Sequence, residues 1–359
     1  MASKSDNKGG QYRSGYVLYG ASFMVTIVAG YALAHTLVPS VSFDRAKPPG
    51  FTRVTKPERP PLNKAAYDAK MLALAHRAAT SSATSTPHLW PPKTVYPHGG
   101  ALLPFNRIVA YYGNFLSRQM GILGEYPRAE VLAKLQAAVA EWQIADPSTP
   151  VIPAIDYIAI TAQADPGKDG MYRLRMPDTE TQKALDMARE INGIVFLEVQ
   201  VGKSTLAQEL PLLESFLKQP QVHLALDPEF AMKKSAPGTV IGFMTADDIN
   251  YAAEYIAGLV RTYDLPPKVL LVHRFTTDMV RNAEAIRPLP EVQVVMVMDG
   301  WGPPEQKIDT HEHIIYPEPV QFTGFKIFYK NDRKPPSRGL LTPAEVLKLT
   351  PQPSFIQYQ

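Results

Sequence analysis

From residue 106 onward the chain alternates short apolar runs with stretches of helical character. Runs such as IVFLEV and VLLV are apolar without alternation, which is typical of parallel strands buried on both faces. Eight strands with seven connections over about 250 residues predict a TIM-like (β/α)8 barrel of the α/β class, with a doubly wound open sheet as the alternative. The predicted strands are residues 108–112, 151–157, 194–199, 222–226, 269–273, 292–298, 322–328 and 355–358.

The connections between these strands carry helical signals. Apolar residues recur at helical spacing in 131–142 and 249–260. Thr342 with Glu345, and Thr179 with Gln182, have the spacing of capping boxes that begin helices. Two connections are less regular, because 301–319 has a poor helical pattern and 228–245 reads as a long loop.

The first 105 residues differ from the rest. Residues 15–38 contain no Asp, Glu, Lys or Arg and are long enough to cross a bilayer core of about 30 Å. We therefore predict a cytoplasmic basic tail at 1–14, a single transmembrane helix at 15–38, a Pro-rich basic linker at 39–105 and the barrel at 106–359, in the periplasm or outside the cell. A cleaved signal peptide ending near Ala34 is the alternative. Small residues on one face predict contact with other membrane helices: Ser22, Thr26, Gly30 and Ala34.

Charge is distributed unevenly along the chain. Residues 1–105 contain 12 basic and 4 acidic residues, whereas the remainder contains 25 basic and 30 acidic residues. A mildly acidic barrel does not predict a nucleic-acid partner, while the basic arm suits anionic lipid or serves simply as a solvated linker. The chain contains no cysteine, which excludes thiol nucleophiles and Cys-ligated metal centres. We predict no cofactor and no metal.

Candidate chemistry lies at the ends of the predicted strands, because barrel enzymes place their reactive groups after the C-terminal ends of strands. Glycoside hydrolysis needs one protonated and one ionised carboxyl group. We predict Glu198 with Asp227 or Glu229 as this pair, and a structural polar ring as the alternative. The predicted substrate-binding residues are Tyr112, Asn114, Asp156, His273, Arg274 and Asp299; Gln200, Lys326 and Gln357 complete the polar strand ends.

Three motifs are discounted. Residues 201–205 resemble the end of a phosphate-binding loop, but position 197 is Leu instead of the required glycine, so a strand-to-helix turn is predicted. His311 and His313 are predicted to lie in a solvated loop rather than a metal site. No G-x-S-x-G sequence presents a nucleophilic serine.

Five segments resemble an uncharacterised bacterial family of exported, TIM-barrel-like proteins. They are AYYGNFLSRQMGILGEYP, LALDPEF, MDGWGPP, QFTGFKIFYKND and FIQYQ. The resemblance covers nearly all of 106–359 and implies a barrel related in shape to sugar-active hydrolases. It implies no substrate.

Two kinds of function remain. The main prediction is a non-catalytic accessory or stabilising subunit of a larger membrane complex, for example photosynthetic or respiratory. Its partners would be the transmembrane helices and extracytoplasmic surfaces of that complex, which would explain the predicted anchor and linker. The alternative is an anchored glycoside-hydrolase-like enzyme that uses the strand-end carboxylates, and a sugar or peptide receptor is a third reading.

Overall fold

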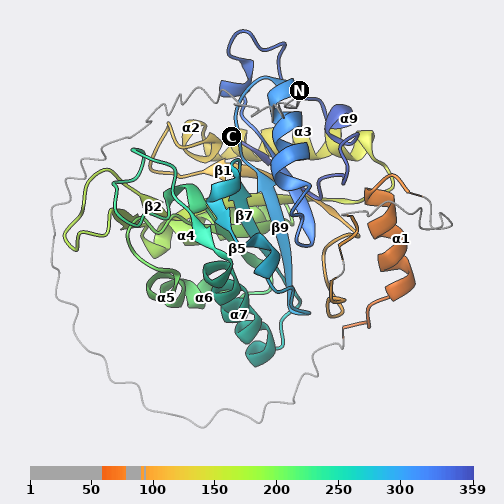
Figure 1. Ribbon diagram of the computed structural model, residues 1–359, viewed down its shortest axis with the longest axis horizontal. Helices are drawn as coiled ribbons and strands as arrows, with labels where there is room; N and C mark the ends of the chain where they lie inside the picture. The colour runs from red at the N-terminus through yellow and green to blue at the C-terminus, as the bar shows by residue number, and fades with distance from the viewer. Residues whose placement is uncertain (1–58, 78–89, 93) are drawn as a thin grey trace, which may run out of the picture.

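A closed barrel of eight parallel strands forms the centre of the protein (Figure 1). The computed structural model describes residues 59–77, 90–92 and 94–359. Strand β1 pairs with β11 on one side and with β2 on the other, which closes the sheet and excludes the open-sheet alternative. The barrel prediction is confirmed. In spatial order the strands are β1 (Arg107–Gly113), β11 (Phe355–Tyr358), β10 (Phe322–Ile327), β9 (Val292–Met298), β7 (Lys268–Arg274), β5 (Val222–Leu226), β4 (Ile194–Val199) and β2 (Val151–Ala162).

Alternate residues of each strand face the barrel interior and the surrounding helices. Ala110, Ala154 and Phe196 belong to the interior cluster, whereas Val109 and Ile155 belong to the larger cluster between strands and helices. Both faces are apolar over most of each strand, which explains the unbroken apolar runs in the sequence.

Helices surround the strands, with α4, α5 and α6 on the left of the view in Figure 1, α7 below and α1 on the right. The smaller strands are β3 (Arg173–Arg175), antiparallel to β2, and the pair β6 (Met244–Thr245) and β8 (Val280–Arg281). The α-helices are α1 (Lys64–Leu74), α2 (Ile122–Glu125), α3 (Arg128–Ala145), α4 (Asp178–Glu190), α5 (Leu206–Glu209), α6 (Glu214–Leu217), α7 (Ala246–Tyr263), α8 (Pro304–Thr310) and α9 (Pro343–Val346). Short 3-10 turns lie at Leu210–Leu213, Pro228–Phe230, Thr277–Met279, Ala283–Ala285 and Asn331–Arg333.

The described part of the N-terminal region packs under the barrel. Tyr67 and Met71 of α1, together with Trp90 and Leu103, join the interior cluster. The indole of Trp90 donates a hydrogen bond to the carbonyl of Met71 at 3.0 Å and meets Phe322, at the start of β10, edge to face. These residues therefore close the end of the barrel where the strands begin.

Three local predictions are corrected. Helix α4 begins at Asp178 after Pro177, so Thr179 is inside the helix and does not cap it. The segment 301–319 contains α8 followed by a π-helical turn, His311–Ile315, because its apolar residues are irregularly spaced and concealed the helix. His311 is fully buried there, although a solvated loop was predicted. The capping box of Thr342 and Glu345 is present at α9 as predicted.

Among the described residues, no helix combines the length and apolar character needed to cross a bilayer. The predicted transmembrane segment, 15–38, and its packing residues Ser22, Thr26, Gly30 and Ala34 lie outside the described ranges.

Candidate active site

Each strand of the barrel supplies one polar side chain to the interior at its C-terminal end. Several of these side chains join strands that are not neighbours, such as Tyr112 of β1 with Glu198 of β4, so they meet inside the barrel. All eight are less than a tenth exposed. We call them the strand-end layer: Tyr112, Asp156, Glu198, Asp227, His273, Asp299, Lys326 and Gln357.

Glu198 lies at the centre of this layer and its first carboxylate oxygen is held by two donors. The hydroxyl of Tyr112 donates to Oε1 at 2.8 Å, and the amide of Gln200 donates to it at 2.9 Å. The same amide reaches Oδ2 of Asp227 at 3.4 Å, which links the two carboxyl groups. The second oxygen, Oε2, lies 3.2 Å from Nε2 of His273. Glu198 is therefore fixed on both sides.

His273 connects Glu198 to a second ion pair. Its Nδ1 lies 3.1 Å from Oδ2 of Asp299, and Nζ of Lys326 lies 2.9 Å from Oδ1 of the same carboxylate. Burial opposes a charge on the imidazole, but Asp299 and Glu198 outweigh it and raise the pKa of His273 to about 10. Burial likewise opposes ionisation of Asp299, yet Lys326 and His273 hold its pKa below the usual value.

Two carboxyl groups of the layer are instead favoured in the neutral form. Burial, and then the charge of Glu198, raises the pKa of Asp156 to about 8. Burial, followed by the charges of Glu198 and Glu229, raises the pKa of Asp227 well above its usual value. Asp156 accepts a hydrogen bond at Oδ2 from Gln357 at 2.6 Å, while its Oδ1 has no partner among the described residues.

Glu229 follows β5 and is more accessible than the layer itself. It is half-buried, and its carboxylate makes no hydrogen bond or ion pair with any described residue. Its backbone N–H donates to Oδ1 of Asp227 at 3.0 Å, within a 3-10 turn that begins at Pro228. Burial, and then the charge of Asp299, raises the pKa of Glu229 to about 7, against the opposing effects of Lys326 and His273.

Two predicted site residues lie apart from this network. The guanidinium of Arg274 points out of the layer, donating to the carbonyl of Thr277 at 2.8 Å and pairing with Glu318. Asn114 braces the loop after β1, where it donates to the carbonyl of Ile158 at 3.1 Å and accepts from Leu116. Both follow a layer residue in sequence, but Arg274 is on the opposite face of its strand.

Sequence reasoning gave no role to Trp301, which comes two residues after Asp299. Its side chain is 38% exposed, although large aromatic residues are usually covered. Nζ of Lys334 lies 5.1 Å from the centre of its ring. The sequence signal that could have identified it is its position, two residues after the strand-end carboxylate Asp299.

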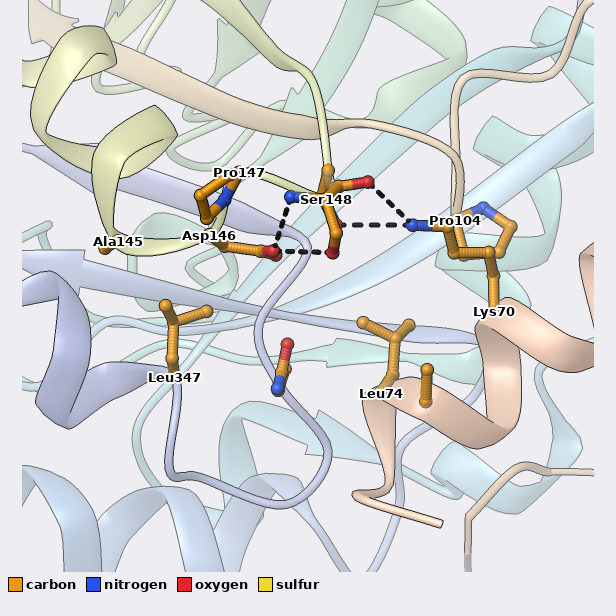
Figure 2. Close-up of a pocket in the computed structure, with 11 residues that line it drawn as sticks. Lys70, Leu74, Pro104, Ala145, Asp146, Pro147, Ser148 and Leu347 are labelled. Carbon is orange, nitrogen blue, oxygen red and sulfur yellow. Dashed lines mark hydrogen bonds between the residues drawn. The ribbon is translucent and has the colours of Figure 1, made fainter. Parts of the chain in front are cut away.

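A surface pocket of about 310 Å³ lies at the opposite end of the barrel (Figure 2). Its walls come from α1 and from residues that precede β1, β2 and β11, such as Pro104, Ser148 and Gln352. Lys70 donates to the carbonyl of Ser148 across it at 3.0 Å, and Asp146 is paired with Arg107. It contains no acid–base pair, and this end of a barrel generally serves stability.

No family model matches the chain, and no curated protein matches its sequence. Among solved structures, the chain is similar to the spore cortex-lytic enzyme SleL of Bacillus megaterium, with 13% identity and a TM-score of 0.36 over 79% of this chain and 65% of SleL. It thus spans less than two thirds of that enzyme. It is also similar to mannanase man26 of Bacillus subtilis, with 11% identity and a TM-score of 0.38 over 71% of this chain and 79% of the mannanase.

The sequence-based prediction of a non-catalytic accessory subunit is wrong. The solved structures to which the chain is similar are enzymes, among them a mannanase and a cortex-lytic enzyme. That prediction depended on the composition of the anchor and linker, which bears on location and not on the barrel. At these TM-scores the similarity does not identify a reaction, so the reaction has to be argued from the strand ends.

Proposed function

We propose that the chain is a glycoside-hydrolase-like enzyme in which Glu229 and Asp299 form the acid–base pair. The observation that carries this proposal is the opposite state of two neighbouring carboxyl groups. Asp299 is held ionised by Lys326 at 2.9 Å, while Glu229 has no cation partner among the described residues and a pKa of about 7. Neighbouring carboxyl groups whose environments drive their pKa values apart are suited to acid and base roles.

In this mechanism Glu229 donates its proton to the glycosidic oxygen as the bond to the sugar breaks. Asp299 faces the positive charge that develops at the sugar carbon. It either attacks that carbon, forming a glycosyl ester that water deprotonated by Glu229 then hydrolyses, or takes the proton from a water molecule that attacks the carbon directly. The half-exposed ring of Trp301 offers an apolar platform for the sugar face next to Asp299. Glu198, which is fully buried, positions His273 behind Asp299.

The test is release of reducing sugar from a panel of plant and bacterial cell-wall polysaccharides by the full chain. Glu229→Gln and Asp299→Asn should each lower kcat/KM by about 10²–10⁴-fold, the usual contribution of general acid–base catalysis. Glu130→Gln is the matched control, because Glu130 is exposed on α3 outside the barrel. Unchanged activity in either site variant, or no hydrolysis of any polysaccharide by the wild-type chain, would overturn the proposal.

The proposed location is outside the cytoplasm, with the barrel exported and tethered by residues 15–38 and the basic linker beside anionic lipid. This part rests on the uncharged 24-residue segment and on the basic composition before residue 106. Protease treatment of intact and of permeabilised cells tests it. Digestion of the barrel only after the inner membrane is broken would contradict export.

A further inference from the structure

Three side chains on the floor of the strand-end layer have buried polar atoms without an aligned hydrogen-bond partner among the described residues. These atoms are Oδ1 of Asp156, Oε2 of Glu198 and both ring nitrogens of His273, and Oε2 of Glu198 lies 3.2 Å from Nε2 of His273 as an ion pair. One ligand atom from each of the three residues lies within 4.8 Å of the other two. Buried polar atoms are nearly always hydrogen-bonded, so this group of atoms requires an explanation.

The other atom of each group is held from behind. Gln357 donates to Oδ2 of Asp156 at 2.6 Å. Tyr112 and Gln200 both donate to Oε1 of Glu198. Oδ2 of Asp299 lies 3.1 Å from Nδ1 of His273, which leaves Nε2 as the ring atom that faces the carboxylates.

We propose that Asp156, Glu198 and His273 bind a divalent transition-metal ion. Two carboxylate oxygens and one imidazole nitrogen form a donor set that suits Zn²⁺ or Mn²⁺, and three protein ligands leave a position for water. A carboxylate behind the imidazole and an amide behind the aspartate are the outer contacts that orient metal ligands.

Distance and charge both fit this assignment. Ligands at about 2.0–2.2 Å around a tetrahedral ion lie about 3.3 Å apart, and Nε2 of His273 lies 3.2 Å from Oε2 of Glu198. Lys326 is already paired with Asp299, and Asp156 has no ion pair among the described residues. A dication that takes the place of the imidazole proton would supply the positive charge that His273 otherwise supplies to Glu198, and would also compensate an ionised Asp156.

The metal site goes beyond the proposed hydrolysis, because neither Glu229 nor Asp299 is among its ligands. Loss of hydrolysis in Glu229→Gln with retained metal would separate the two proposals, and so would hydrolysis by a chain that binds no metal.

The experiment measures Zn²⁺ bound to the full chain. All three ligands are fully buried, so the chain is unfolded with chelator present, refolded with and without Zn²⁺, desalted and analysed for metal content and melting temperature. We expect one Zn²⁺ per chain and a higher melting temperature. Asp156→Asn and His273→Gln should each weaken Zn²⁺ binding at least tenfold, and Gln357→Leu, behind the site, by about 10–100-fold.

Asp227→Asn is the matched control, because Asp227 is an equally buried aspartate of the same layer whose two oxygens accept hydrogen bonds from Glu229 and Gln200. It should retain the wild-type affinity. If Asp156→Asn does not refold, the Gln357→Leu variant decides alone. If the wild-type chain that was refolded with Zn²⁺ contains no Zn²⁺ after desalting, the proposal is overturned, since His273 is then only a buried ion-pair partner. An equal loss of Zn²⁺ affinity in Asp156→Asn and Asp227→Asn, or an unchanged Zn²⁺ affinity in His273→Gln, would also overturn it.

Discussion

Replacing Lys326 with Met tests whether the barrel depends on its buried ion pair with Asp299. The charged atoms lie 2.9 Å apart and both side chains are at most 6% exposed, so water screens them little. At an effective dielectric constant of about 20, their attraction is about 6 kcal/mol, which burial of the two charges opposes. Lys326→Met leaves the buried carboxylate of Asp299 with His273 as its remaining cation in the layer, and we expect it to lower the free energy of unfolding by about 3 kcal/mol, the lower end of the range for a broken buried pair.

The penalty should depend on pH. Without Lys326, only His273 at 3.1 Å still opposes the effect of burial, so the folded-state pKa of Asp299 rises above its value in the folded wild type. The folded variant therefore binds a proton more readily than the folded wild type, and the stability lost by removing Lys326 is greatest where Asp299 is ionised and shrinks as pH falls through the pKa of Asp299. The difference from wild type should therefore be larger at pH 8 than at pH 5.

The assay is urea unfolding, monitored by tryptophan fluorescence, of the wild type, Lys326→Met, Asp299→Asn and the double variant. Because the two side chains touch, the double variant should lose less stability than the two single variants together, by at least about 1 kcal/mol. Additive losses within about 0.5 kcal/mol at pH 8 would refute the reasoning, since the pair would then contribute nothing as a pair.

Four further outcomes are expected. Hydrolysis should fall about tenfold per pH unit above pH 7, because Glu229, with a pKa of about 7, must be protonated to act as the acid; a pH–rate profile of kcat/KM that stays flat to pH 9 would exclude Glu229. Trp301→Ala should raise KM about tenfold with little change in kcat, and steady-state kinetics showing an unchanged KM would remove the sugar platform. Phe196→Ala should lower the free energy of unfolding by about 3–5 kcal/mol in a urea titration, because it leaves a cavity where the buried ring packs edge to face on Phe355 at 5.3 Å. Phe196→Leu, which fills most of that space, should lose less than about 1.5 kcal/mol, and equal losses in the two variants would contradict the cavity argument. Thr245→Ala removes the capping box at the start of α7 and should cost about 1 kcal/mol by the same titration, whereas no measurable loss would mean that the box contributes nothing.

The eight strands could be predicted from the sequence because each is buried on both faces, which leaves an unbroken apolar run. The boundaries were less accurate, since pairing and not composition decides where a strand ends. Strand β2 continues to Ala162, five residues beyond the predicted end at Tyr157, through an irregular register near Ile158 and Ile160. The π-helical turn at His311 was missed because its burial comes from the surrounding fold.

The residues of the candidate site could be predicted as far as the C-terminal ends of the strands could be located in the sequence. Taking the polar residue at each strand end identified the whole strand-end layer, but it also included Arg274, which lies one residue beyond His273 and so faces the other side of β7. The interior positions of β7 alternate, so the series Val269 and Leu271 continues to His273 and excludes Arg274. Which carboxyl group is free and which is paired could not be predicted, because these contacts cross the barrel between strands distant in sequence.

The layer is difficult to explain as a structural feature alone. The next layer of the barrel interior, two residues earlier along each strand, is filled by apolar side chains such as Ala154, Phe196 and Leu271. These side chains stabilise the barrel without burying any charge. The strand-end layer instead buries four carboxyl groups with only one lysine and one histidine, and it leaves an oxygen of Asp156 and an oxygen of Glu198 without an aligned hydrogen bond. Buried charges stabilise poorly compared with apolar groups of the same volume. Departures from good packing of this kind are expected at functional sites. The layer therefore supports the proposed cation site on its floor and the proposed acid–base pair of Glu229 and Asp299.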